Sequence, residues 1–159
     1  MPDQLGVLIN NFVIDDISDN TLKDIFAYWL AMKDGRIMPS RRDLNPADIV
    51  ALLPHISLID VDPLSGRYKI RLLGTKVVEA LGKDITGRYI DECPDIETCL
   101  KPRYDWIVEN KRPYLISDKL KWSDKSFLEF CSVGMPMSSD GRQVDIIMYG
   151  SCFYFPQNN

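Results

Sequence analysis

The two apolar runs at the end of the chain, Phe127–Met135 and Val144–Phe155, constrain its fold more than any other feature. In both runs the odd-numbered and the even-numbered positions are apolar: Cys131, Val133 and Met135 against Leu128 and Phe130, then Ile147, Tyr149 and Phe153 against Ile146, Met148 and Cys152. Successive side chains of a strand point to opposite faces of a sheet. We therefore expect two strands that are covered on both faces.

An amphipathic helix is predicted over residues 19–34, with Asp19 or Asn20 capping its start and Gly35 closing its end. Its apolar stripe carries Leu22, Ile25, Phe26 and Trp29. Two surfaces can cover the outer sheet face: this helix of the same chain, or the matching surface of a second chain. We favour a homodimer in which these four residues form the interface, and the sequence leaves both arrangements open.

The middle of the chain alternates between short helices and strands. We predict a hairpin around the turn Pro63–Gly66, formed by the strands Ile56–Asp62 and Arg67–Leu73. We also predict a short helix over Thr75–Leu81, which ends at Gly82. A longer helix is predicted over 96–110, with Tyr104 inward and Pro102 beginning or kinking it, and a strand over 113–121. Asn45 and Pro46 start a short helix that ends near Leu53. Residues 5–17 have an ambiguous period.

Length and charge narrow the class of protein. The chain has 159 residues and a net charge of −4, which suits one globular domain and offers no general attraction for nucleic acids. Basic and aromatic residues alternate in the segment Lys101–Lys125, as they do in some nucleic-acid binding surfaces. We interpret the segment instead as a solvated helix face and an edge strand whose lysines, Lys119 and Lys121, prevent pairing with another chain. The longest apolar run, Phe26–Met32, is far short of the about 20 residues of a membrane helix. We expect a cytoplasmic protein without membrane or nucleic-acid contacts.

The four cysteines (Cys93, Cys99, Cys131, Cys152) and the single histidine, His55, limit the possible chemistry. No two cysteines form the close pair that zinc sites use, so no metal site is predicted. Any catalytic triad would have to use His55, which we expect at a strand edge, bonded to a backbone carbonyl. We therefore predict no catalytic residue and no enzyme activity.

Four short motifs, in order, resemble a family of short bacterial PAS-domain proteins. They are Pro39–Asp43, Leu52–Ile56, Arg67–Thr75 and Gly82–Arg88, and the resemblance spans about residues 28–154. It implies an α+β fold with a five-stranded antiparallel sheet, a helical crossover on one face and N-terminal helices. We divide the chain into an N-terminal capping or dimerisation segment, 1–35, and a PAS-like domain, 36–159.

The resemblance also implies a small cavity between the sheet and the crossover helices. Strand alternation then predicts the side chains that line it, if Glu129 and Asp145 point to water. The predicted ligand-binding residues are Tyr68, Ile70, Leu72, Phe130, Ser132, Ile146 and Met148. A few hydroxyls among apolar walls are typical of ligand pockets, and equally of a filled core.

The sequence lacks the residues that bind the cofactors common in PAS domains. An axial haem ligand usually projects from the helical part, whereas His55 precedes the first strand. Cys93 and Cys99 do not lie in the sequence that binds flavin covalently, although non-covalent flavin stays open. We predict a non-enzymatic PAS sensor that binds a small molecule or a protein signalling partner. The alternatives are a homodimerisation scaffold without ligand and, third, an enzyme of unidentified reaction.

Overall fold

The computed structural model describes residues 6–121, 123–125 and 128–155, and its centre is a five-stranded sheet. The strands are β1 (Ile56–Val61), β2 (Tyr68–Leu73), β3 (Tyr114–Lys119), β4 (Glu129–Met137) and β5 (Ile146–Tyr154). Their order is β2-β1-β5-β4-β3, and every neighbouring pair is antiparallel. The predicted α+β fold is therefore confirmed. Phe127, predicted to begin the fourth strand, lies outside the described residues.

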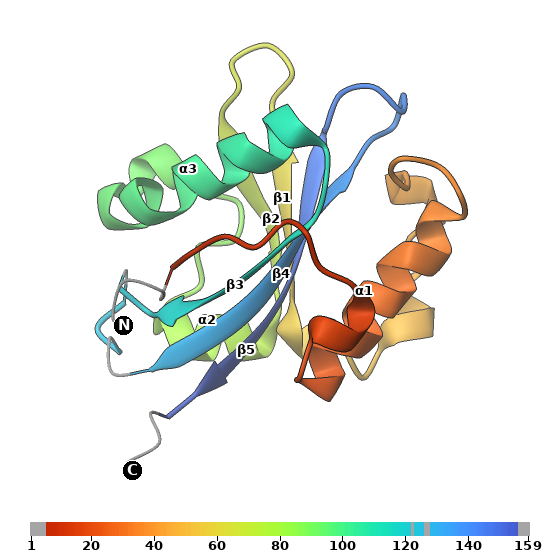
Figure 1. Cartoon of the computed structure of the whole chain (residues 1–159). Helices are drawn as coiled ribbons and strands as arrows, with labels where there is room; N and C mark the ends of the chain where they lie inside the picture. The colour runs from red at the N-terminus through yellow and green to blue at the C-terminus, as the bar shows by residue number, and fades with distance from the viewer. Residues whose placement is uncertain (1–5, 122, 126–127, 156–159) are drawn as a thin grey trace.

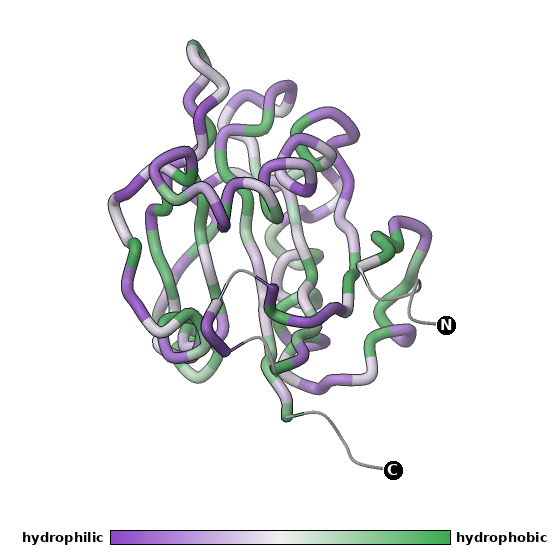
Figure 2. The backbone as a smooth tube through the Cα atoms, turned by 90° about the vertical axis from the view of Figure 1, so that its left-hand side faces the viewer, coloured by the Kyte–Doolittle hydropathy of each residue, from purple (hydrophilic) through white to green (hydrophobic). Residues whose placement is uncertain are grey.

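Helices cover both faces of this sheet (Figure 1). One face carries α2 (Thr75–Leu81) and α3 (Pro94–Asn110), and the opposite face carries α1 (Asn20–Lys33). Two hydrophobic clusters follow from this arrangement, one on each side of the sheet. In Figure 2 hydrophobic colour gathers along the strands, while the connecting loops are largely hydrophilic. Most apolar residues on both faces of β4 and β5 are thus buried within one chain.

The helix α1 forms near its predicted bounds and with the predicted cap at Asp19, but Asp34, one residue before the predicted Gly35, is its C-terminal cap. The Asp19 carboxylate accepts a hydrogen bond from the Leu22 N–H at 3.0 Å and caps the start, and Asp34 ends the helix in the left-handed region with φ of 47°. The Trp29 Nε1–H donates to the Pro136 carbonyl at 3.0 Å. Gly150 of β5 lets the helix approach closely, because a Cβ atom there would lie 2.9 Å from Ile25 Cδ1.

The predicted interface residues of α1 are buried within the chain. Leu22, Ile25, Phe26 and Trp29 are at most 5% exposed and pack in the cluster that covers the outer sheet face. The interpretation of these four residues as a surface for a second chain does not match this placement. The physical reason is that α1 folds back onto β4 and β5, so the apolar face is covered in cis.

The other elements lie near their predicted bounds, with two differences. Pro94 occupies the first turn of α3, and Pro102 lies inside that helix instead of beginning it. The ambiguous N-terminal stretch is mostly irregular: Ile9 exchanges backbone hydrogen bonds with Leu115 of the edge strand β3, at 2.8 Å each. This pairing covers part of an edge that would otherwise expose unpaired backbone groups. No helix in the described part of the chain is long and apolar enough to cross a bilayer.

Candidate functional site

A cavity of about 70 Å³ lies between the sheet and the helices α2 and α3. Its walls are mainly aliphatic and aromatic, with contributions from all five strands and both helices. A cavity that holds one water needs about 10–15 Å³, whereas pockets for drug-sized ligands measure about 300–1,000 Å³. The free space therefore suits a very small molecule.

Three of the predicted ligand-binding residues line this cavity: Ile70, Phe130 and Ser132. Tyr68 is buried in the same hydrophobic cluster but lies beside the cavity, where its hydroxyl donates to the Asp105 carboxylate. A ligand-binding role for these residues stays a prediction.

The orientation predicted for Leu72 is wrong, because β2 contains a bulge. Leu58 lies opposite Leu72 and Ile59 opposite Ile70, so the backbone of Arg71 lies opposite no β1 residue, although its guanidinium pairs with Asp60. One extra residue reverses the faces that the following side chains reach. Leu73 consequently lines the cavity, and Leu72 lies on the other face at 37% exposure.

Ile146 and Met148 also point away from the cavity, into the cluster beneath α1. Their prediction assumed that Asp145 marks the solvent face of β5. Asp145 instead precedes the strand, and its carboxylate accepts hydrogen bonds from the Ser139 N–H and hydroxyl. The phase of β5 follows from its pairing with β4: Ser132 opposes Ser151, and directly opposite residues share a face.

Three of the cavity residues that the sequence prediction missed come from β5, where the predicted face was the wrong one. Tyr149, Ser151 and Phe153 line it, opposite β4 positions of the correctly predicted face. The signal that identifies them is register: once Phe130 and Ser132 are inward, their partners on β5 must be inward as well. Tyr104 of α3, predicted to point inward, does line the cavity.

Several polar side chains of the cavity wall are hydrogen-bonded to one another. The hydroxyls of Tyr114 and Tyr149 are hydrogen-bonded to each other, and Ser132 Oγ lies 2.8 Å from Ser151 Oγ. The Tyr104 side chain is 3% exposed and lines the cavity, and its hydroxyl is not one of the fully buried polar atoms that lack a hydrogen bond in the described part of the chain. Burial raises the pKa of all three tyrosines, so each phenol stays protonated and able to donate.

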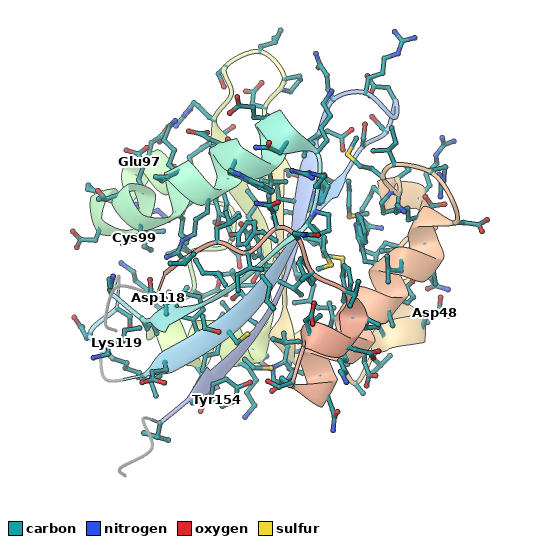
Figure 3. The ribbon with its side chains drawn as sticks, in the orientation of Figure 1. Asp48, Glu97, Cys99, Asp118, Lys119 and Tyr154 are labelled. Carbon is teal, nitrogen blue, oxygen red and sulfur yellow. The ribbon has the colours of Figure 1, made fainter. Side chains whose placement is uncertain are left out.

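One charged residue, Arg103, also lines the cavity. Its Nη2 donates to Asp118 Oδ2 at 3.1 Å, and the Asp118 side chain is only 2% exposed. Figure 3 labels Asp118 on the edge strand β3. The ion pair therefore connects the cavity wall on α3 to the strand beside which the N-terminal segment runs, where the Gly6 N–H donates to the Ser117 carbonyl at 2.9 Å.

His55 lies away from the cavity, at the end of the sheet near the start of α1. Its Nδ1 is 3.1 Å from the Ser151 carbonyl oxygen, which is the backbone contact that the sequence analysis expected. The Cys152 Sγ is 3.7 Å from the same nitrogen and 3.5 Å from Asp19 Oδ1. Burial and the Asp19 charge raise the pKa of Cys152 to about 12, which keeps the thiol protonated.

No group of three or more His, Cys, Asp or Glu side chains in the described residues is arranged to hold a metal ion. The arrangement that remains is a small, mainly apolar cavity with a few hydrogen-bond donors and one cation.

Comparison with known proteins identifies a matching family and similar solved structures. A family model described as a PAS domain matches residues 17–110. A search of curated proteins finds no match. Among solved structures, the chain is similar to the crystal structure of a sensory box sensor histidine kinase from Vibrio cholerae, at 14% identity and a TM-score of 0.49. That match covers 70% of this chain and 90% of the other.

Proposed function

Since the chain belongs to the PAS domain family, and so to a class of sensory and signalling modules, we propose that it is a non-enzymatic sensor whose core cavity binds a small molecule. The observation that carries this proposal is the cavity between the sheet and α3, with apolar walls and a few hydrogen-bond donors. Such a combination is what small-molecule sites use for affinity and orientation.

The contacts of α3 supply a route by which binding could change the rest of the molecule. Tyr104 and Arg103 of this helix face the cavity, and Arg103 is tied to Asp118 of β3. A Cβ atom on Gly6 would lie 2.8 Å from Asp118 Oδ2, so the N-terminal segment packs directly over that carboxylate. A ligand that prefers one position of Arg103 would shift the population of N-terminal arrangements.

Native mass spectrometry of the purified protein tests this function. We expect added mass that is released on denaturation. Val77 of α2 lines the cavity, so Val77→Phe should fill it and abolish the added mass, whereas Val78→Phe on the same helix should leave it unchanged. A bare protein that no panel of small molecules stabilises against heat would contradict the proposal.

The second candidate is a scaffold without ligand. The observation in its favour is the cavity volume of about 70 Å³, well below that of most ligand pockets. In that case the same spectrum should show a protein without added mass, and Val77→Phe should change stability alone.

The proposal includes two further interactions, one with a second copy of the chain and one with a protein signalling partner. Because α1 buries its apolar stripe within the chain, a homodimer would have to form through other surfaces. The mass of the native species reports the oligomeric state in the same experiment.

A further inference from the structure

Two of the free cysteines lie directly opposite each other in the sheet. Cys131 of β4 and Cys152 of β5 are register partners, and both pack in the hydrophobic cluster on the α1 side. Opposite residues of an antiparallel pair have Cα atoms about 4.5 or 5.5 Å apart and side chains on the same face. A disulfide spans Cα distances of about 4.4–6.8 Å. The backbone therefore places the two cysteines at a distance that a disulfide can bridge.

The bridge between these strands would be strained. Opposite Cβ atoms in a sheet lie about 4.5–5.5 Å apart, whereas a disulfide holds its Cβ atoms about 3.5–4.5 Å apart. The strands β4 and β5 would have to draw together slightly at this point. A strained disulfide is more easily reduced than a relaxed one, so this bridge would be reversible.

The two thiols differ in their exposure. Cys131 is half-buried, whereas Cys152 is 5% exposed and lines an open groove of about 500 Å³ at the end of β5. Burial raises the pKa of both thiols, and a hydrogen bond with Ser117 acts to lower that of Cys131. The thiolate is the form that attacks a disulfide. Cys131, the more exposed of the two, is therefore the attacking residue, and Cys152 is the resolving one.

The Cys152 thiol also contacts the start of α1. Its Sγ donates to Asp19 Oδ1 at 3.5 Å, and the same oxygen caps the helix by accepting from the Leu22 N–H. The hydroxyl of Tyr154, labelled in Figure 3 at the end of β5, donates to the other carboxylate oxygen. A disulfide sulfur has no hydrogen to donate. Oxidation would therefore remove one of the hydrogen bonds that hold the cap.

We propose that Cys131 and Cys152 form a reversible disulfide on reaction with a low-molecular-weight disulfide, and that this bridge loosens the first turn of α1. The Cys131 thiolate attacks one sulfur of the oxidant and expels the other half, which leaves a mixed disulfide on Cys131. Cys152 then attacks the Cys131 sulfur and expels the second half. Each expelled thiolate takes up the proton of the cysteine that displaced it. Two protein thiols are thus oxidised, and the external disulfide is reduced to two thiols.

This inference goes beyond the proposed function, because the cysteine pair lies on the sheet face opposite to the cavity. Oxidised glutathione is the probe. The reduced full chain is incubated with it in mildly alkaline buffer, alkylated and digested, and the linked peptides are identified by mass spectrometry. We expect a Cys131–Cys152 link that dithiothreitol removes. The controls Cys93→Ser and Cys99→Ser should form this link to the same extent.

Single variants of the pair test the two roles. In Cys152→Ser the reaction should stop at a glutathione adduct of Cys131, whereas in Cys131→Ser the buried Cys152 should stay reduced. Hydrogen exchange of the unaltered chain tests the effect on α1. The Leu22 amide should exchange about two-fold faster or more in the oxidised form, and the Lys33 amide in the last turn should not change. Equal exchange of the Leu22 amide in both forms would overturn the link to the helix cap.

The remaining outcomes separate this inference from the proposed function. Equal linkage among all four cysteines, or no link at all, would overturn the disulfide. Val77→Phe, which fills the cavity on the other face, should form the bridge like the unaltered chain. A chain that binds a small molecule in the cavity but forms no Cys131–Cys152 link would overturn this inference alone. A chain that forms the link and binds no small molecule would overturn the proposed function alone.

Discussion

At the scale of residues, three buried tyrosines that look equivalent in the sequence have different roles. Tyr114 and Tyr149 satisfy each other through their hydroxyls, while Tyr104 contributes its ring to the core and lines the cavity. The ring of Tyr104 contacts those of Tyr68 and Tyr149, with centroids 5.1 and 5.6 Å apart. The aromatic packing therefore holds Tyr104 in the wall of the cavity.

Replacement of these tyrosines by phenylalanine should separate the two roles. Tyr114→Phe leaves the buried Tyr149 hydroxyl without its partner and should lower the free energy of unfolding by about 1–3 kcal/mol. Tyr104→Phe removes a hydroxyl that takes part in none of the hydrogen bonds of the described residues and should change it by less than about 0.5 kcal/mol, or raise it. Urea unfolding measures both values. An equal loss in the two variants would mean that the Tyr104 hydroxyl has a partner after all.

At the scale of elements, α1 shows how local and distant contacts combine. Asp19 caps the helix and also accepts a hydrogen bond from the Tyr154 hydroxyl at the end of β5. The apolar stripe of the helix then packs onto the outer face of the sheet. One side chain thus sets both where the helix begins and where it sits relative to β5.

The cap makes the stability of α1 dependent on pH. Burial acts to raise the pKa of Asp19, but hydrogen bonds from Tyr154 and the Leu22 N–H outweigh it and hold the pKa below 3.8. Its contribution is therefore complete above pH 3.8 and is lost as the pH falls through the lower folded value. Asp19→Ala should cost about 1 kcal/mol at pH 7, and the cost should shrink in acid. Denaturant unfolding at several pH values measures it.

Asp19→Asn is the matched control, because an amide oxygen still accepts the Leu22 hydrogen bond. It should cost less than Asp19→Ala and show no loss of effect in acid. A cost of Asp19→Ala that is the same at pH 3 and pH 7 would contradict the role of the ionised cap.

Truncation of the α1 stripe should affect folding instead of assembly. Phe26 is 5% exposed beneath the helix, so Phe26→Ala should lower the free energy of unfolding by about 3–5 kcal/mol. Leu30 is 39% exposed on the same helix, and Leu30→Ala should cost less than about 1 kcal/mol. Thermal unfolding and the native mass separate the two effects. A Phe26→Ala variant that keeps its stability but changes its oligomeric state would restore the interface interpretation.

At the scale of the whole molecule, β4 and β5 belong to two hydrophobic clusters at once. Their side chains alternate between the cavity side and the α1 side, and both sides are buried. The sheet therefore contributes side chains to both hydrophobic clusters, and removing the helices from either face exposes a large apolar surface. The division into a capping segment, 1–35, and a PAS-like domain, 36–159, stays a prediction, and this burial is the physical argument for it.

A fragment of residues 36–159 should accordingly fail to fold alone. It would expose Val133, Met135 and Met148, each 0% exposed in the intact chain. We expect loss of the near-ultraviolet circular dichroism signal and of cooperative unfolding. Adding a peptide of residues 17–35 should restore part of both. A fragment that unfolds cooperatively without the peptide would show that the sheet is stable without its outer layer.

Several elements could be predicted from the sequence because their signals are local. The α1 helix, the Thr75–Leu81 helix and the hairpin around Pro63–Gly66 depend on caps, periodicity and turn residues a few positions apart. The inward faces of Phe130 and Ser132 followed from alternation along a single regular strand. The PAS-like order of elements was visible in the motifs between them.

Tertiary structure alone decided which side of the sheet several residues reach and what they meet there. Ile146 and Met148 face α1 because β5 is set by its register with β4, and Leu72 is turned outward by a bulge at Arg71. The coverage of the outer face in cis, and the placement of Tyr104 and Arg103 in the cavity wall, depend on contacts between distant segments. Local sequence determines which elements form, whereas faces and polar partners follow from register and packing across the whole chain.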